Sequence, residues 1–241
     1  MKLLTAIPVF NEERNLEAAL AEVRRHVDDI LVVNDGSTDR TSDLLMRQKD
    51  LHIVSHRVNR GYGGAIISAM AYAMAHDYDV LVTTDCDGQH EPARIPVLLE
   101  ALGEDVDIVS GSRYLRTFRQ NTPPPEDRQR INHVVTAELN ERLGLHLTDA
   151  FCGFKAYRVR ALRHLQLNET GWGMPLQVWV QAAQLGLRIR EVAVPLVYLD
   201  PSRAFGGMLN DPEKRLAYYR EVIDRELARC RMQPCMNGGC Y

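Results

Sequence analysis

Two carboxylates one residue apart, Asp85 and Asp87, directly follow an apolar run in this chain, and Gln89 adds an amide two residues later. Two anions this close together would not be buried without a partner, because an unpaired buried carboxylate is strongly disfavoured. Oxygen ligands of this kind suit Mg²⁺ or Mn²⁺, and such an ion typically bridges protein carboxylates and substrate phosphates. The same residue types also form ordinary solvated turns. Their position in the fold has to decide between these two interpretations.

Four polar loops follow four apolar runs in the first half of the chain. They are Asn11-Glu12, Asn34 to Ser37, Asn59 to Gly64 and Asp85 to His90. In an open parallel sheet, ligands bind beyond the carboxyl ends of the strands. Four unrelated loops would not all carry short polar residues at one edge unless that edge held a ligand. This shared placement favours a metal site over a solvated turn at Asp85 and Asp87.

Two of these loops suggest contacts to an anionic or nucleotide ligand. Asp35 is suited to accept a hydrogen bond from a base or a ribose, while Thr38 or Asp39 is expected to cap the helix that follows. The glycines of residues 59–64 permit close approach of the backbone to a ligand, and the start of the next helix favours anions. The spacing fits neither GxxxxGK[ST] nor GxGxxG, so this loop is a weak signal by itself.

Strands and helices alternate along the first half of the chain and position these loops. Apolar runs predict strands at 2–8, 30–33, 51–55, 80–84 and 107–110, and helical spacing predicts helices at 15–26, from 39, at 63–76 and at 92–102. This alternation predicts an α/β fold whose mostly parallel sheet is covered on both faces. After Arg113 we expect a proline-rich loop at 117–127, helices at 128–143, 176–185 and from 211, and a strand at 188–194.

Composition excludes several classes of protein. With 29 Lys and Arg against 32 Asp and Glu, the net charge is −3, so the chain lacks the basic excess of a nucleic-acid binder. Its 45% hydrophobic and 25% charged residues are typical of a globular domain. No apolar run approaches the roughly 18 residues of a membrane helix. We expect the first run to be a strand and not a signal peptide, and the five cysteines to be reduced thiols.

Six segments in register resemble the family 2 glycosyltransferases, which have the Rossmann-like GT-A fold. The segments are residues 7–13, 33–39, 59–65, 85–90, 111–114 and 148–155. The chain is most similar to the subgroup of polyprenyl- or dolichyl-phosphate mannosyltransferases and glucosyltransferases, over roughly residues 1–207. The resemblance implies a donor half at 1–112, a smaller acceptor-side half of the same domain at 113–207, and an amphipathic helix and tail at 208–241.

The resemblance also implies roles for individual residues. A GDP- or UDP-linked sugar would be bound by Pro8, Val9, Glu12, Asp35, Gly64, Asp85 and Cys86. Mg²⁺ or Mn²⁺ on the diphosphate would be held by Asp85, Asp87 and Gln89. The expected catalytic residues are Asp87, Asp149 and Arg113. The candidates for contact with an acceptor phosphate are Arg113, Arg128, Arg130 and Arg203.

Two kinds of acceptor remain open, and they demand different chemistry. A lipid phosphate is already an anion, so it needs arginines to position it and no general base. A sugar hydroxyl needs a carboxylate base, for which Asp149 is the leading candidate. The leading expectation is an inverting transfer of mannose or glucose to a polyprenyl phosphate. The absence of a Gln-x-x-Arg-Trp segment favours a single transfer over processive synthesis.

Departures from the family pattern lie on the acceptor side. The family often has an acidic residue in place of Gln177, and Gly207-Met208 stands where relatives often carry Ser-Lys. A nucleotide-sugar-binding module without catalysis is therefore a third hypothesis. We expect a cytoplasmic protein that meets its lipid peripherally at the membrane surface or through a partner protein, and a homo-oligomer is the other assembly considered. For the last helix, packing on the domain with its charges exposed to solvent is favoured over lying on an anionic membrane.

Overall fold

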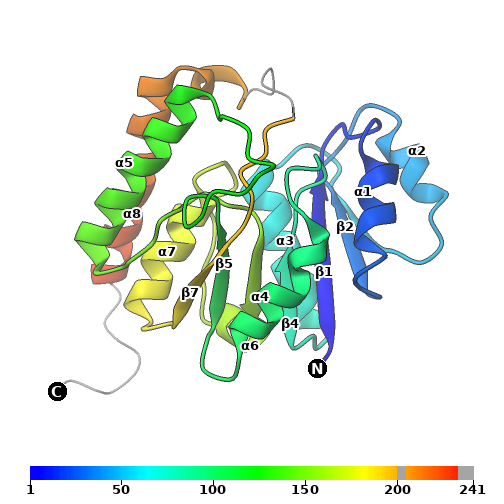
Figure 1. The fold of residues 1–241 in the computed structure, drawn as a ribbon, viewed down its shortest axis with the longest axis horizontal. Helices are drawn as coiled ribbons and strands as arrows, with labels where there is room; N and C mark the ends of the chain where they lie inside the picture. The colour runs from blue at the N-terminus through cyan, green and yellow to red at the C-terminus, as the bar shows by residue number, and fades with distance from the viewer. Residues whose placement is uncertain (200–204, 233–241) are drawn as a thin grey trace.

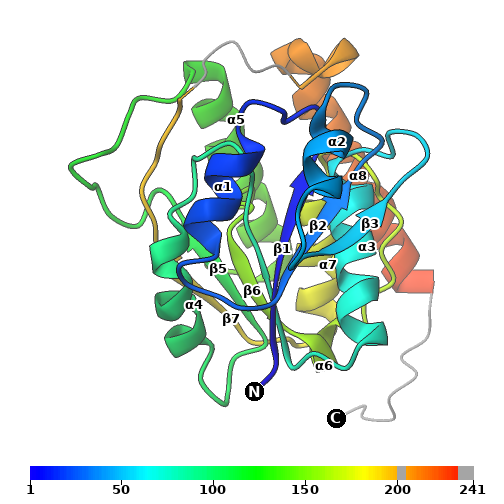
Figure 2. The same cartoon turned by 90° about the vertical axis from the view of Figure 1, so that its right-hand side faces the viewer.

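The computed structural model describes residues 1–199 and 205–232, which form a central sheet between two layers of helices (Figure 1 and Figure 2). The seven strands found there have the order β3-β2-β1-β4-β6-β5-β7. They are β1 (Leu3–Val9), β2 (Ile30–Asn34), β3 (His52–Ser55), β4 (Val80–Thr83), β5 (Ile108–Ser112), β6 (Lys155–Arg158) and β7 (Ile189–Ala193). The helices are α1 (Leu16–Val23), α2 (Thr41–Met46), α3 (Tyr62–Ala75), α4 (Ile95–Leu102), α5 (Glu126–Leu143), α6 (Val159–Leu162), α7 (Met174–Gln184) and α8 (Pro212–Met232), with short 3₁₀ turns η1 (Pro92–Arg94) and η2 (Gly207–Asn210).

The sheet is parallel except at one strand. β1, β2, β3 and β4 pair in parallel, as do β5 and β7, whereas β6 runs antiparallel between β4 and β5. The predicted α/β class with a mostly parallel sheet is confirmed. β6 was not predicted, because a four-residue strand has too short an apolar pattern to recognise. The division of the domain at residue 112 stays a prediction.

β6 matters because it brings a distant segment to the ligand-binding edge. Lys155 pairs with Thr83 at the end of β4, and the Thr83 hydroxyl donates a hydrogen bond to the Gly153 carbonyl at 2.7 Å. The residues just before β6 therefore lie beside the residues just after β4. This pairing places the segment 149–153 next to the loop that carries Asp85 and Asp87.

Two apolar cores lie on the two faces of the sheet. Within β2, Leu31 and Val33 pack into the core under α3, α5, α7 and α8, while Ile30 and Val32 pack into the core under α1 and α4. All five residues of β2 are buried. This explains why the central strands are continuously apolar and do not alternate, as expected for a parallel sheet covered on both faces.

Several predicted helix boundaries shift for local reasons. α5 begins at Glu126, two residues before its predicted start, because Pro125 occupies the N-cap position and leaves Glu126 and Asp127 in the first turn, where acidic side chains suit the helix dipole. The N-cap of α2 is Arg40 and not Thr38 or Asp39. Asp39 still contributes, since its Oδ1 accepts a hydrogen bond from the Thr41 N–H at 2.9 Å.

α8 packs on the domain around one buried carboxylate. Glu226 is 2% exposed and accepts hydrogen bonds from Gln177 at 2.7 Å, from Gln181 at 2.8 Å and from Arg229. Gln177 therefore departs from the family pattern next to a carboxylate that α8 supplies, and an acidic residue there would face a second anion. The expected packing of α8 is confirmed. None of the helices in the described residues is long and apolar enough to cross a membrane.

We predict that Glu226→Ala lowers the free energy of unfolding by about 3 kcal/mol, because it leaves two buried amides and Arg229 without their acceptor. Urea denaturation measures the change. Glu221→Ala, at an exposed position of the same helix, is the control and should change stability by less than about 0.5 kcal/mol. Equal effects of the two substitutions would contradict a central role for Glu226 in holding α8.

Candidate active site

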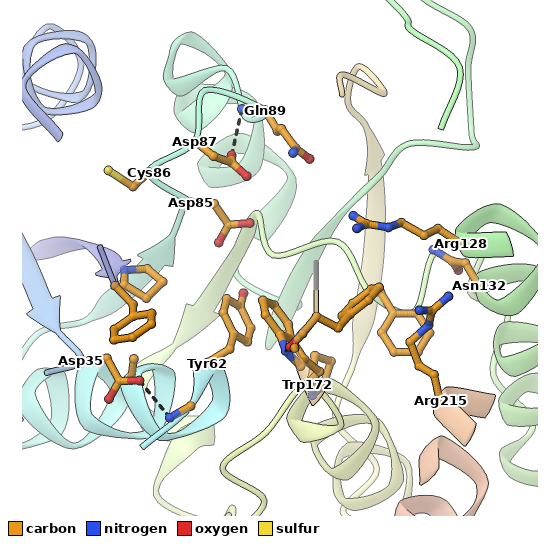
Figure 3. A pocket seen from close by; sticks show the side chains of 18 of the residues that line it. Asp35, Tyr62, Asp85, Cys86, Asp87, Gln89, Arg128, Asn132, Trp172 and Arg215 are labelled. Carbon is orange, nitrogen blue, oxygen red and sulfur yellow. Dashed lines mark hydrogen bonds between the residues drawn. The ribbon is translucent and has the colours of Figure 1, made fainter. Parts of the chain in front are cut away.

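The carboxyl ends of the central strands open onto a pocket of about 710 Å³. Ten of the residues predicted from the sequence line it: Pro8, Val9, Glu12, Asp35, Asp85, Cys86, Asp87, Gln89, Arg113 and Arg128. The strand-end loops identified in the sequence thus converge on one cavity. Figure 3 shows Asp35 at one end, Arg128 and Arg215 at the other, and the loop of Asp85 and Asp87 between them.

At one end of the pocket, the Asp35 carboxylate holds a loop in place through hydrogen bonds. Asp35 accepts hydrogen bonds from the backbone N–H groups of Arg60 and Gly61, each at 2.8 Å, and His56 Nδ1 lies 2.6 Å from its Oδ1. Gly36, at φ 70°, permits this turn, because a Cβ there would lie 2.6 Å from the Asn59 nitrogen. Asp35 therefore holds loop 59–61 in place and also faces the pocket.

The acidic loop is also held in a defined shape. Asp87 Oδ1 accepts a hydrogen bond from the Gln89 N–H at 3.0 Å, and the Asp85 N–H donates to His90 Nδ1 at 3.0 Å. Burial lowers the pKa of His90 to about 4, so the ring is neutral and its proton lies on Nε2. That Nε2 is 3.7 Å from Asp85 Oδ2. His90 thus accepts a hydrogen bond from the backbone of the acidic loop, while Asp85 lines the pocket.

The donor set fits a divalent cation that shares its ligands with a substrate. Within residues 1–199 and 205–232, no group of three or more His, Cys, Asp or Glu side chains forms a complete metal site. Two carboxylates and one amide oxygen are the partial set typical of Mg²⁺ or Mn²⁺ that also binds phosphate oxygens. Space is reserved for Asp85, since a Cβ on Gly153 would lie 2.9 Å from its Oδ2 and 2.7 Å from the Tyr62 hydroxyl.

Asp149 is not among the residues that line the pocket, and its position near the sugar stays a prediction. It is fully buried and forms a bidentate ion pair with Arg113, with Nε–Oδ2 at 2.6 Å and Nη2–Oδ1 at 2.9 Å. Asn132 and the Phe151 N–H also donate to it. The Arg113 guanidinium and these donors hold the pKa of Asp149 well below its usual range. A carboxylate with a lowered pKa and this many donors is a weak base, and its contacts hold the Arg113 side chain in place.

At the other end of the pocket, arginine side chains lie against aromatic rings. Arg215 of α8 is 2% exposed, ion-pairs with Asp127, and lies with Arg128 against the Phe205 ring, at 4.4 Å and 4.7 Å from its centroid. Trp172 donates its indole N–H to the Phe205 carbonyl at 3.1 Å and stacks on the Tyr62 ring, with the centroids 5.1 Å apart. These side chains surround a volume suited to a negatively charged group.

Part of this end was not predicted from the sequence. Arg215 belongs to the last helix, whose charges were expected to face solvent, and Trp172 was not among the predicted site residues, whereas both line the pocket. The available signal was the Arg-Ala-Phe-Gly-Gly loop at 203–207, which pointed to this region without identifying the partners of Phe205. Those partners come from α5, from α8 and from the segment before α7, so spacing in the sequence does not connect them.

Two other predicted residues do not line the pocket, and a third lies outside the described residues. Gly64 is not among the lining residues; its N–H donates to the Thr170 carbonyl at 2.9 Å, and a Cβ there would lie 2.9 Å from the Arg60 Cβ. It serves the packing of the first turn of α3. Arg130 is exposed on α5 and does not line the pocket. Arg203 lies outside the described residues.

Comparison with known proteins places the chain among glycosyltransferases. The profile described as Glycosyl transferase family 2 matches residues 5–166. The chain is 34% identical to an undecaprenyl-phosphate mannosyltransferase of Micrococcus luteus, over 88% of this chain and 90% of the relative. It is 30% identical to a polyprenol monophosphomannose synthase of Mycolicibacterium smegmatis, over 80% and 76% of the two chains. Glucosyl-3-phosphoglycerate synthase from Mycobacterium tuberculosis, solved with UDP, shares the fold at a TM-score of 0.70 and 22% identity, over 97% of this chain and 82% of that one.

We predict that Asp149→Asn lowers the free energy of unfolding by about 3 kcal/mol near neutral pH, because it leaves the buried Arg113 guanidinium without its counter-charge. The folded-state pKa of Asp149 lies below its unfolded value of about 3.9, so the pair stabilises fully above that pH and its contribution is lost as the pH falls toward the folded-state pKa. The difference from wild type should therefore be constant above about pH 5 and shrink below about pH 4.

Urea denaturation across this pH range measures the effect. Asp105→Asn, which removes an exposed partner of Arg188, is the matched control and should cost less than about 0.5 kcal/mol. A difference for Asp149→Asn that is small at every pH would show that Arg113 does not depend on this carboxylate.

Proposed function

The chain belongs to glycosyl transferase family 2 and is a glycosyltransferase, and from this premise we propose that it transfers mannose from a nucleoside diphosphate to a polyprenyl phosphate, with inversion. One observation carries the choice of acceptor. The carboxylate that would serve as base, Asp149, is locked in an ion pair with Arg113, while arginine side chains line the pocket. That combination suits an acceptor that is already an anion.

The acceptor phosphate is assigned to the end of the pocket that holds Arg128 and Arg113. Both arginines line the cavity, and a guanidinium binds phosphate oxygens in a fixed, often bidentate geometry. A sugar hydroxyl would instead require a base to remove its proton. The names of the relatives from M. luteus and M. smegmatis, which are a mannosyltransferase and a phosphomannose synthase of polyprenyl lipids, support the same acceptor and the sugar.

The donor is assigned to the opposite end. Asp35, Pro8 and Val9 line that side of the cavity, and the carboxylate of Asp35 lies at the ordered loop 59–61. We place the nucleoside there and the diphosphate beside Asp85 and Asp87. This arrangement agrees with a donor half at residues 1–112. The acceptor end draws on α8 as well as on residues 113–207, because Arg215 and Tyr219 line it.

The chemistry that follows is a single displacement. An acceptor phosphate oxygen forms a bond to the anomeric carbon, the bond from that carbon to the diphosphate breaks, and its electron pair leaves with the nucleoside diphosphate. Mg²⁺ or Mn²⁺ held by Asp85, Asp87 and Gln89 would offset the charge that grows on the leaving group. Arg113, kept in place by Asp149, adds positive charge in a partly buried site, where it acts more strongly than in water. No proton needs to be removed from the acceptor.

We predict metal-dependent binding of GDP in preference to UDP, because mannose donors in this proposal are GDP-linked. Calorimetric titration with each nucleotide, with and without Mn²⁺, measures it. Asp87→Asn should abolish the part of the affinity that depends on the metal, since it removes one anionic ligand. Asp50→Asn, at an exposed position that does not line the pocket, is the control and should bind as wild type does. Metal-independent binding of both nucleotides would reject the metal site.

We predict that Arg128→Gln raises the KM for a lipid phosphate acceptor by about tenfold or more, because it removes a charge-assisted contact. The affinity for GDP and Mn²⁺ should stay unchanged, since the donor lies at the other end of the pocket. Arg130→Gln, two residues further along α5 and exposed, is the matched control. Steady-state transfer assays with a short polyprenyl phosphate compare the two variants, and equal KM values would place the phosphate elsewhere.

A further inference from the structure

Large apolar side chains are exposed on the segments that build the pocket. Leu115 is 45% exposed, Leu199 64% and Met208 74%. Each lies one or two positions beyond a residue that lines the cavity, namely Tyr114, Tyr198 and Gly206. We call these three side chains, together with those of Arg116 and Arg119, the rim. The rim therefore belongs to the segments that build the pocket.

The segments that carry the rim are packed against one another. The Tyr198 N–H donates to the Thr122 hydroxyl at 2.6 Å, and the Thr122 N–H donates to the Leu196 carbonyl at 2.8 Å. These bonds tie the loop after β5 to the segment after β7. Leu199 also touches the acidic loop, since its Cδ1 would lie 3.1 Å from a Cβ on Gly88. Figure 1 shows the starts of α5 and α8 at this same end of the molecule, away from the N-terminus.

Cationic side chains accompany the apolar ones. Arg116 and Arg119 are exposed and form no ion pair with another residue of the described chain; Arg116 lies over the Phe118 ring, 5.4 Å from its centroid. Many other arginines of this protein are paired, as Arg220 is with Glu138 and Arg142 with Asp224. Exposed apolar side chains beside exposed arginines are the chemistry that an anionic bilayer surface binds.

We propose that the rim side chains bind the surface of an anionic lipid bilayer and that the mouth of the pocket then faces the membrane. The proposal rests on the proposed function, because a polyprenyl chain stays in the bilayer and its phosphate must enter the pocket from there. Three apolar side chains with two arginines produce weak, reversible attachment. The electrostatic part of it should weaken as salt screens the charges.

The test is binding to vesicles of phosphatidylcholine, with and without phosphatidylglycerol and without any donor or acceptor. The variant Leu115→Ser/Met208→Ser should bind vesicles about tenfold less than wild type, because it removes exposed apolar contacts. The matched control is Leu185→Ser/Met232→Ser. It also removes one leucine and one methionine, 41% and 78% exposed, at the far ends of α7 and α8, and it should bind as wild type does. Leu199 is left intact because it touches the acidic loop.

A second variant tests the charges. Arg116→Gln/Arg119→Gln should lose the extra binding that phosphatidylglycerol confers and keep the binding to neutral vesicles. The proposal is overturned if wild type does not bind vesicles or if Leu115→Ser/Met208→Ser binds as wild type does. It is also overturned if Leu185→Ser/Met232→Ser loses as much binding as that variant.

Transfer assays separate this proposal from the proposed function. With a long polyprenyl phosphate in vesicles, Leu115→Ser/Met208→Ser should transfer about tenfold more slowly, in proportion to its lost binding. With a short, water-soluble polyprenyl phosphate it should equal wild type. If wild type itself transfers to neither acceptor, the proposed function fails, while the vesicle measurements still decide whether the rim binds a bilayer.

Discussion

The buried pair of Asp149 and Arg113 joins the parts of the molecule that have to meet at the site. Asp149 begins the segment that leads into β6, Arg113 follows β5, and Asn132 reaches the same carboxylate from α5. Two charges removed from water are costly unless each finds a close partner and further hydrogen bonds. The bidentate geometry and the donors around it meet that condition. The arrangement of β5, β6 and α5 thus depends on an ion pair that also aims a guanidinium at the pocket.

That constraint decides what kind of chemistry the pocket can support. A carboxylate that accepts five hydrogen bonds, three of them from Arg113, has little tendency to take a proton. The remaining charge in the pocket is arranged by sign, with Asp85 and Asp87 between the Asp35 end and the arginines. A phosphate acceptor fits this arrangement because it arrives as an anion and needs positioning more than it needs a base.

Much of the fold and of the donor side could be predicted from the sequence, because the signals there are local. Apolar runs followed by Asp35 or by Asp85 and Asp87 identify strand ends, and strand ends of a parallel sheet meet at one edge. β6 escaped prediction because it is short and antiparallel to its neighbours. In the sequence Gln177 was a departure from the family pattern on the acceptor side, whereas in the fold it donates to the carboxylate of Glu226, 49 residues away.

The sequence by itself determined the α/β class, the family resemblance and the ring of polar loops, since each depends on residue types within a few positions of one another. Only the tertiary structure decided the surroundings of Asp149 and Arg215, because the pKa and the position of a charged side chain depend on the residues that contact it. Those partners are 36 residues away for Asp149 and 88 for Arg215. Asp149 is a weak base because it is paired with the Arg113 guanidinium. Arg215 lines the pocket because Phe205 and α5 pack against it, which its position on a charged helix does not reveal.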